Sequence, residues 1–300
     1  MTDLVIRHLA EDESHLFESM PASPLVGFAA FGDSFGDMAA QGEYRPEWIW
    51  VALRDGKVVA RAAWWGGPGD SRPATLDWFD FTDAQAATEL LRTAPLRAQY
   101  MLKLPPDWRE NPAVRAEADA RVAAASAAGL TPQGERNHYR WTPGCGLPQR
   151  PGRLRFLPEP DDAVILDVFR RIHRGSLDSQ VRRTVEASGI DVAAQEQLDY
   201  LLWMPSPRSW WRLAHTPDGE LAGLVAPCRN YTAPLIGYVG VVPEQRGHNY
   251  AYDLLAEATH FLAAEGADCV TAGTDRANTP MVGAFLRAGY PVAQRRIDLI

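Results

Sequence analysis

The spacing of apolar residues along the chain alternates between a helical and a strand period. In the second half, apolar residues recur every three or four positions over residues 161–172, 191–202, 250–264 and 280–287, which predicts four helices. Alternating or β-branched stretches predict strands at residues 154–157, 210–215, 221–227, 235–242, 269–272 and 292–300. The predicted order of elements is therefore βααβββαβαβ.

The first half shows the same rhythm. Strands are expected at residues 4–8, 48–53, 58–65, 75–81, 100–104 and 137–141, and helical residues from Glu11, at 84–91 and at 112–128. A chance likeness between two common α/β patterns is the alternative. A tandem repeat of one α/β domain explains the shared order more simply, with a mixed, mostly antiparallel sheet flanked by helices in each copy.

The two copies are separated by residues 141–152, which contain three prolines and three glycines. Such a segment sustains neither a helix nor a central strand. It predicts a first domain at residues 1–141, a linker at 142–152 and a second domain at 153–300.

Composition narrows the class of protein. The formal net charge is -8 and no block of Lys and Arg stands out, which argues against a nucleic-acid partner. Cys145, Cys228 and Cys269 are far apart, so we expect neither a disulfide framework nor a metal site. The first residues lack the pattern of a signal peptide, and no apolar run is long enough for a membrane helix. A cytoplasmic monomer or homodimer, with no membrane partner, is expected.

The most informative stretch is a predicted strand that ends at Pro243, followed by a short loop with Arg246 and Gly247 and then a long helix. The first N–H groups of a helix have no partner within the helix, and the positive end of the helix dipole lies beside them. A turn of this kind suits a diphosphate group.

This stretch resembles the acyl-CoA pyrophosphate loop of GNAT N-acetyltransferases, in which Arg/Gln-x-x-Gly-x-Gly/Ala follows a strand ending in Val-x-Pro. Here Val241-Val242-Pro243 precedes Arg246-Gly247-His248-Asn249-Tyr250-Ala251. Asn249 replaces the central glycine of the family, and asparagine tolerates a left-handed backbone better than most residues. The second family motif, an Asn, a helix and then Gly-Tyr, is matched by Asn278 and by Gly289-Tyr290. The tandem layout is similar to that of mycothiol synthase-like enzymes.

The resemblance implies acetyl-CoA as co-substrate and no metal. It implies that the Val241 N–H binds the thioester carbonyl, beside Val239, Gly240 and Val242. Backbone N–H groups of the loop should hold the pyrophosphate, at Arg246, Gly247, His248, Asn249, Tyr250 and Ala251. Asn278 should bond the pantetheine arm or brace the loop. Phe285, also counted among the cofactor-binding residues, occupies the position at which many members carry a tyrosine acid.

The usual acid is absent because position 285 is a phenylalanine. The usual base is absent because the strand before the loop has no carboxylate. A carboxylate elsewhere is one account, with Asp275 nearest in sequence and Asp178, Glu186 and Glu196 as others. Tyr238 acting through a water chain is the second account, and positioning alone is the third. Tryptophans either line an acceptor groove or fill cores: Trp48, Trp50, Trp64, Trp65, Trp78, Trp203, Trp210 and Trp211.

Two functions follow as hypotheses. The first is an N-acetyltransferase that moves an acetyl group to a primary amine of a small molecule by direct attack, and the acidic chain suits a cationic acceptor. The second is an acetyl-CoA-binding sensor or partner-binding protein with little or no catalysis. In the first half the segment that matches the loop has no glycine or arginine but contains Asp77, Asp80 and Asp83, which predicts that this half has no CoA site.

Overall fold

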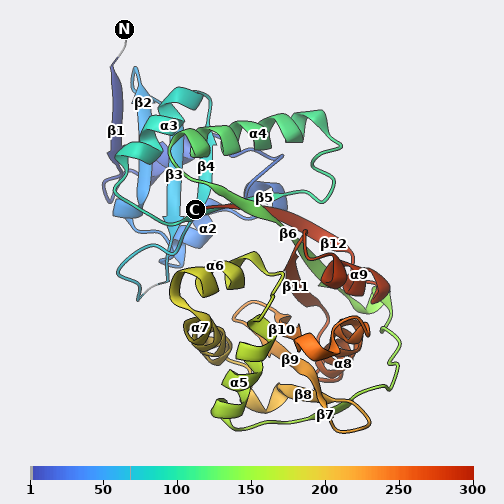
Figure 1. Cartoon of the computed structure of the whole chain (residues 1–300). Coiled ribbons are helices and arrows are strands. Elements are labelled where there is room, and N and C mark those ends of the chain that lie inside the picture. Colours follow the sequence, from blue (N-terminus) through green and yellow to red (C-terminus); the bar gives the residue numbers. More distant parts are fainter. Residues whose placement is uncertain (1–2, 68) are drawn as a thin grey trace. The chain divides into compact units, whose positions relative to one another are not determined.

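Two spatial units make up the computed structural model, which describes residues 3–67 and 69–300. The first unit comprises residues 1–135 with 294–300, and the second comprises residues 136–293 (Figure 1). Both are mixed α/β structures in which helices flank a mostly antiparallel sheet, as predicted.

The sheet of the first unit has the strand order β1-β2-β3-β4-β5-β12 within the described residues. Its neighbours are antiparallel except β4 and β5, which are parallel. The strands are β1 (Leu4–His8), β2 (Ile49–Arg54), β3 (Lys57–Trp65), β4 (Thr75–Phe81), β5 (Gln99–Leu104) and the end of β12 (Val292–Leu299). The α-helices of this unit are α1 (Ser14–Glu18), α2 (Phe35–Ala40), α3 (Ala84–Thr93) and α4 (Pro112–Ala127).

The described strands of the second unit follow the order β7-β8-β9-β10-β11-β6, again with one parallel pair, β10 and β11. They are β7 (Arg155–Leu157), β8 (Arg212–His215), β9 (Leu221–Arg229), β10 (Pro234–Val241), β11 (Val270–Asp275) and the later part of β6 (Pro132–Trp141). The helices are α5 (Asp162–His173), α6 (Ser179–Ser188), α7 (Ile190–Trp203), α8 (Tyr250–Ala264) and α9 (Thr279–Arg287).

The two repeats exchange their last strands. β6 closes the first repeat in sequence, yet its residues from Arg136 pair with β11 in the second unit. β12 closes the second repeat, yet its residues from Arg295 pair with β5 in the first unit, where the C-terminus lies (Figure 1). The units therefore differ at their edges from the expected ranges 1–141 and 153–300, because each sheet is completed by the strand of the other repeat.

Strand alternation places the second sheet between two apolar layers. Leu224 and Ala226 of β9 belong to a cluster that includes residues of α5 and α7, whereas Val225 between them belongs to a cluster with α8 and α9. Figure 1 shows α5 and α7 on the opposite side of these strands from α8.

Most of the predicted elements are present within a few residues, but α2 and α6 were not predicted. The α6 sequence SQVRRTVEAS is mostly polar, and none of its residues is fully buried. Five of the tryptophans considered above fill cores: Trp48, Trp50, Trp64, Trp78 and Trp211. Trp203 instead has 60% of its surface exposed.

Candidate functional site

A gap opens between β10 and β11 in the second unit. The two parallel strands are in register at a single pair, Leu235 with Thr271, and they separate beyond it. A register shift between Ile236 and Tyr238 marks a bulge in β10 directly after that pair. Because a bulge bends its strand and increases the local twist, it accounts for the separation.

Backbone groups of β10 point into this gap. Val242 donates its N–H to the Ala222 carbonyl across the antiparallel β9–β10 pair, at 3.0 Å. Backbone groups of successive residues alternate between the two sides of a strand, so Val239 and Val241 direct theirs away from β9, toward the gap. The Val241 carbonyl confirms this direction because it accepts from the Arg246 side chain instead of from β9.

The gap ends at an exposed loop and an uncapped helix. A short 3-10 turn at Pro243–Gln245 follows β10, and Gly247 has a left-handed backbone with φ of 89°. Asn249, the N-cap of α8, has φ of 61°, the left-handed conformation expected of asparagine there. The Asn249 side chain forms no capping hydrogen bond to the first turn of α8. The loop and helix start therefore leave backbone donors for an anion.

The Arg246 side chain braces this loop. Its guanidinium donates to the carbonyl of Ile172 at 2.7 Å, to that of Gly175 at 3.1 Å and to that of Val241 at 3.3 Å. These three hydrogen bonds connect the end of α5 to the end of β10. Arg246 thus fixes the loop with its side chain, whereas its backbone N–H donates to the Pro243 carbonyl at 3.2 Å and is already engaged.

A second brace, which sequence reasoning missed, joins Arg153 to Asp253. Asp253 lies in the first turns of α8, is only 3% exposed and forms a bidentate ion pair with Arg153. Arg153 also donates to the carbonyl of His248 at 3.1 Å. The signal was an aspartate among apolar helix residues, since a buried carboxylate requires a cation.

Comparison with known proteins assigns this region to a family. Residues 179–290 match the family model described as Acetyltransferase (GNAT) family, and this range contains β8 to β11, the loop and α8. The second unit contains a GNAT domain. Acetyl transfer from acetyl-CoA is the general activity of this family.

Solved structures share the fold over the whole chain. A GCN5-related N-acetyltransferase from Sphaerobacter thermophilus is 15% identical, with a TM-score of 0.54 over 99% of this chain and 94% of its own. The glucosamine N-acetyltransferase region of a fungal multi-domain GH3 β-N-acetylglucosaminidase is 13% identical, with a TM-score of 0.52 over 100% of this chain and 38% of its own. No match was found among curated proteins.

The remaining predicted residues of the GNAT domain have structural partners. Asp275 accepts from Arg136 at 2.9 Å and from the Ser179 N–H at 2.5 Å, so both its oxygens are engaged. Asn278 accepts from the Met281 N–H and caps α9. Phe285 is 2% exposed in the core.

Three further residues named from the sequence are Tyr238, Glu186 and Glu196. The Tyr238 ring lies edge-on to Phe169, with centroids 5.0 Å apart, and burial raises the pKa of its hydroxyl. Glu186 is exposed on α6, and Glu196 on α7 accepts from the Thr184 hydroxyl at 3.2 Å. In the part of the chain that the structure describes, no group of three or more His, Cys, Asp or Glu side chains could hold a metal, and no helix is long and apolar enough to cross a membrane.

The first unit has the strand topology of the GNAT domain, but its helix start is occupied. β4 and β5 are in register only over Thr75 and Leu76 of β4, so they separate as β10 and β11 do. Asp83 accepts from the N–H groups of Gln85 and Ala86 and caps α3. The donors that would hold a diphosphate already have an acceptor.

A side chain also enters the gap between β4 and β5. The Arg121 guanidinium of α4 donates to the Phe79 carbonyl at 3.1 Å and to Asp80 at 2.8 Å. The other Asp80 oxygen accepts from Arg61, which donates in turn to the Phe17 carbonyl. These contacts place protein groups where the GNAT domain has open backbone.

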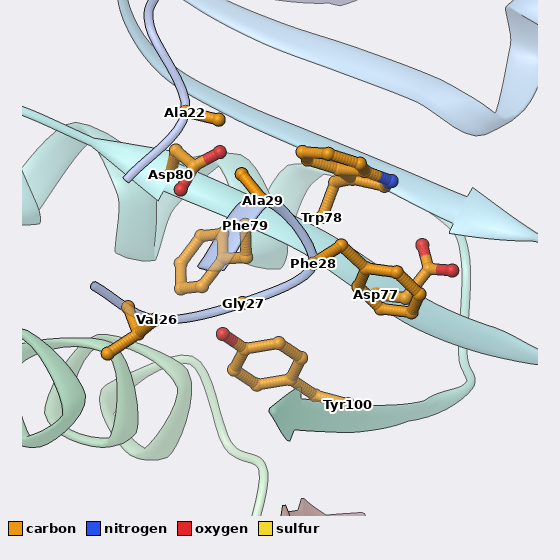
Figure 2. Close-up of a pocket in the computed structure, with 10 residues that line it drawn as sticks. All are labelled: Ala22, Val26, Gly27, Phe28, Ala29, Asp77, Trp78, Phe79, Asp80 and Tyr100. Atoms are coloured by element: carbon orange, nitrogen blue, oxygen red, sulfur yellow. The ribbon is translucent and has the colours of Figure 1, made fainter. Parts of the chain in front are cut away.

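A cavity of about 10 Å³ remains beside this network, enough for about one water molecule. Figure 2 shows it between the loop that carries Gly27 and the strand that carries Asp77, with the hydroxyl end of Tyr100 toward Gly27. Asp77 is 4% exposed, and burial raises the pKa of its carboxyl to about 8. One carboxyl oxygen accepts from the Tyr44 hydroxyl at 2.8 Å, and the other is without a partner within the described residues.

Replacing Asp77 with Asn is expected to change the pH dependence of stability. The folded state holds the Asp77 proton up to about pH 8, whereas an unfolded aspartate loses it near pH 4. The stabilising contribution is thus full below pH 4 and is lost as the pH rises to 8. Unfolding free energies measured at pH 5, 7 and 9 should therefore decline less in Asp77→Asn than in the wild type. Asp119→Asn, an exposed site on α4, is the matched control and should follow the wild type. An Asp77→Asn curve parallel to the wild type would contradict the assignment.

Proposed function

We propose that the GNAT domain transfers an acetyl group from acetyl-CoA to a primary amine of a small molecule. The observation that supports this is the continuity of the Val239 and Val241 backbone groups with the uncapped start of α8. The backbone groups of Val239 and Val241 suit the amide and thioester oxygens of an acyl-CoA, and the start of α8 suits its diphosphate. These polar groups follow one another in the same order along the acyl-CoA molecule.

The chemistry follows from these donors. The acceptor nitrogen attacks the acyl carbon, the new C–N bond replaces the C–S bond, and the thiol leaves. The Val241 N–H stabilises the negative charge that develops on the thioester oxygen, and a fixed donor of this kind is worth about 3 kcal/mol. The nitrogen loses one proton and the sulfur gains one, so the chain needs a path for that proton.

A sensor or partner-binding protein that holds acetyl-CoA without turnover is the second candidate. It is favoured because position 285 carries a phenylalanine in place of the usual tyrosine acid, and because an ion pair holds the nearby Asp275 carboxylate. A screen of wild-type protein with acetyl-CoA and a panel of amines separates the two, because only the transferase releases CoA in proportion to acetylated amine.

We also propose a division of roles between the units. The first unit would be structural and without a CoA site, since Asp83 occupies its helix start and Arg121 its gap. Of the two units, only the GNAT domain would bind acetyl-CoA. The protein would be cytoplasmic.

Calorimetry should give one acetyl-CoA site per chain. At a ligand concentration a hundred times Kd, bound acetyl-CoA should add about 2.7 kcal/mol to the unfolding free energy. Combining Arg246→Glu with Gly247→Pro should abolish both effects, because it reverses the charge of the brace and removes one loop N–H.

Arg115→Glu, an exposed site in the first unit, controls for charge and should bind as the wild type does. Circular dichroism of the double variant checks that the fold survives. Two sites per chain, or binding by the double variant, would overturn the assignment of the loop; an absence of binding to the wild type would end the acetyl-CoA proposal.

A further inference from the structure

His173, the last residue of α5, is a buried histidine without hydrogen-bond partners. It is 3% exposed, and neither of its ring nitrogens has a partner among the described residues. Leaving a buried polar group unpaired costs about 1–3 kcal/mol, so native proteins rarely do it without a bound water or a role that needs the free group.

The ring lies beside the strand that carries the thioester donors. Its centroid is 6.5 Å from that of Tyr238 and 5.9 Å from that of Phe169. The preceding residue, Ile172, lies against Gly240, where a Cβ would come within 2.7 Å of the Ile172 side chain. His173 is therefore placed next to the segment of β10 that ends at Val241.

The charged groups around His173 are themselves engaged. One Asp178 oxygen accepts from the N–H groups of Gln180 and Val181, and the other accepts from Arg136 at 3.2 Å. Asp275 pairs with the same arginine, and the guanidinium of Arg246 is held by backbone carbonyls.

Burial keeps the imidazole neutral at pH 7. It lowers the pKa of His173 to about 4, and the negative charge of Asp178 opposes this shift. Above that pH the ring carries one free lone pair. Once the ring takes a proton, the Asp178 carboxylate stabilises the imidazolium.

We propose that His173 is the proton acceptor of the acetyl transfer. This inference rests on the proposed function. An acceptor ammonium transfers one proton to the ring nitrogen through a water molecule, since the buried ring is not reached directly. The imidazolium releases that proton to solvent, and the resulting amine attacks the acyl carbon. As the C–S bond breaks, a second proton of the nitrogen passes to the departing sulfur. One proton is released to solvent overall, so atoms and charge balance without a further reactant.

His173→Gln tests this role because glutamine stays polar but accepts no proton at neutral pH. With an alkyl amine of pKa about 10, kcat should fall about a hundredfold, while KM for acetyl-CoA stays within about twofold. With an amine that is already unprotonated at neutral pH, the loss in kcat should be only a few-fold, since less proton transfer is required. The acid limb of the wild-type pH profile of kcat should be absent from the variant.

His215→Gln is the matched control, because that histidine lies on β8 and also has a buried nitrogen without a partner. It should keep the wild-type kcat with both amines. If His173→Gln fails to fold, His173→Asn carries the same comparison. An unchanged kcat, or an equal loss with both amines, overturns the inference. A wild type that transfers acetyl to no amine overturns the proposed function instead, and the two failures are distinct.

Discussion

Removing the Asp80 carboxylate is expected to destabilise the first unit by about 3–5 kcal/mol. This side chain lies between two buried arginines, Arg61 and Arg121, whose side chains are 3% and 8% exposed. Asp80→Ala would leave both guanidinium groups buried without their shared counter-ion, and the cost of an unpaired buried charge exceeds the value of the pair itself.

Asp83→Ala is the control for this prediction. Asp83 also pairs with an arginine, but it is partly exposed and mainly caps α3, so its loss should cost about 1 kcal/mol. Urea unfolding at neutral pH, followed by circular dichroism, measures both. Equal losses in the two variants would show that the Asp80 network contributes no more than a helix cap.

Gly223→Ala is expected to disable the GNAT domain. A Cβ at Gly223 of β9 would lie 2.1 Å from the Gly240 carbonyl oxygen and 3.1 Å from the Val241 Cα. Both atoms belong to the backbone of β10, so no side-chain rotation relieves the clash. The strands must separate, at a cost of about 3 kcal/mol. The proposed thioester donors move with β10, so acetyl-CoA binding should be lost.

Gly273→Ala, in β11 of the same sheet, is the matched control. Its Cβ would meet the Asn137 carbonyl at 3.6 Å, an ordinary contact. Unfolding free energy and acetyl-CoA affinity should both stay near the wild-type values. A Gly223→Ala variant that binds acetyl-CoA as tightly as Gly273→Ala would show that the strand spacing is not needed.

Sequence periodicity predicted the elements that bury a regular apolar face. α8 begins at Tyr250 and ends at Ala264 as expected, because its apolar stripe contacts the sheet. α6 escaped notice because its sequence is mostly polar and none of its residues is fully buried, so its apolar signal is weak. The exchange of β6 and β12 was also invisible, because strand pattern records which face is buried and not which neighbour supplies the hydrogen bonds.

The same distinction applies to the candidate site. The loop could be predicted because a local motif encodes its backbone, including the left-handed Asn249. The Arg153–Asp253 brace joins residues 100 positions apart, and the Arg121 side chain reaches a strand 42 positions earlier. Such pairs depend on how distant segments meet, which neither period nor spacing records.

The exchanged strands determine the order in which the two sheets can form during synthesis. β5 has no partner on this side until residues 295–299 have been synthesised, long after β5 itself. Until then the first repeat has an open edge and a β6 strand still without β11, the two hazards that favour wrong pairing in a nascent chain. Because β11 precedes β12 in the chain, synthesis interrupted between them would leave the first unit, and not the GNAT domain, without its last strand.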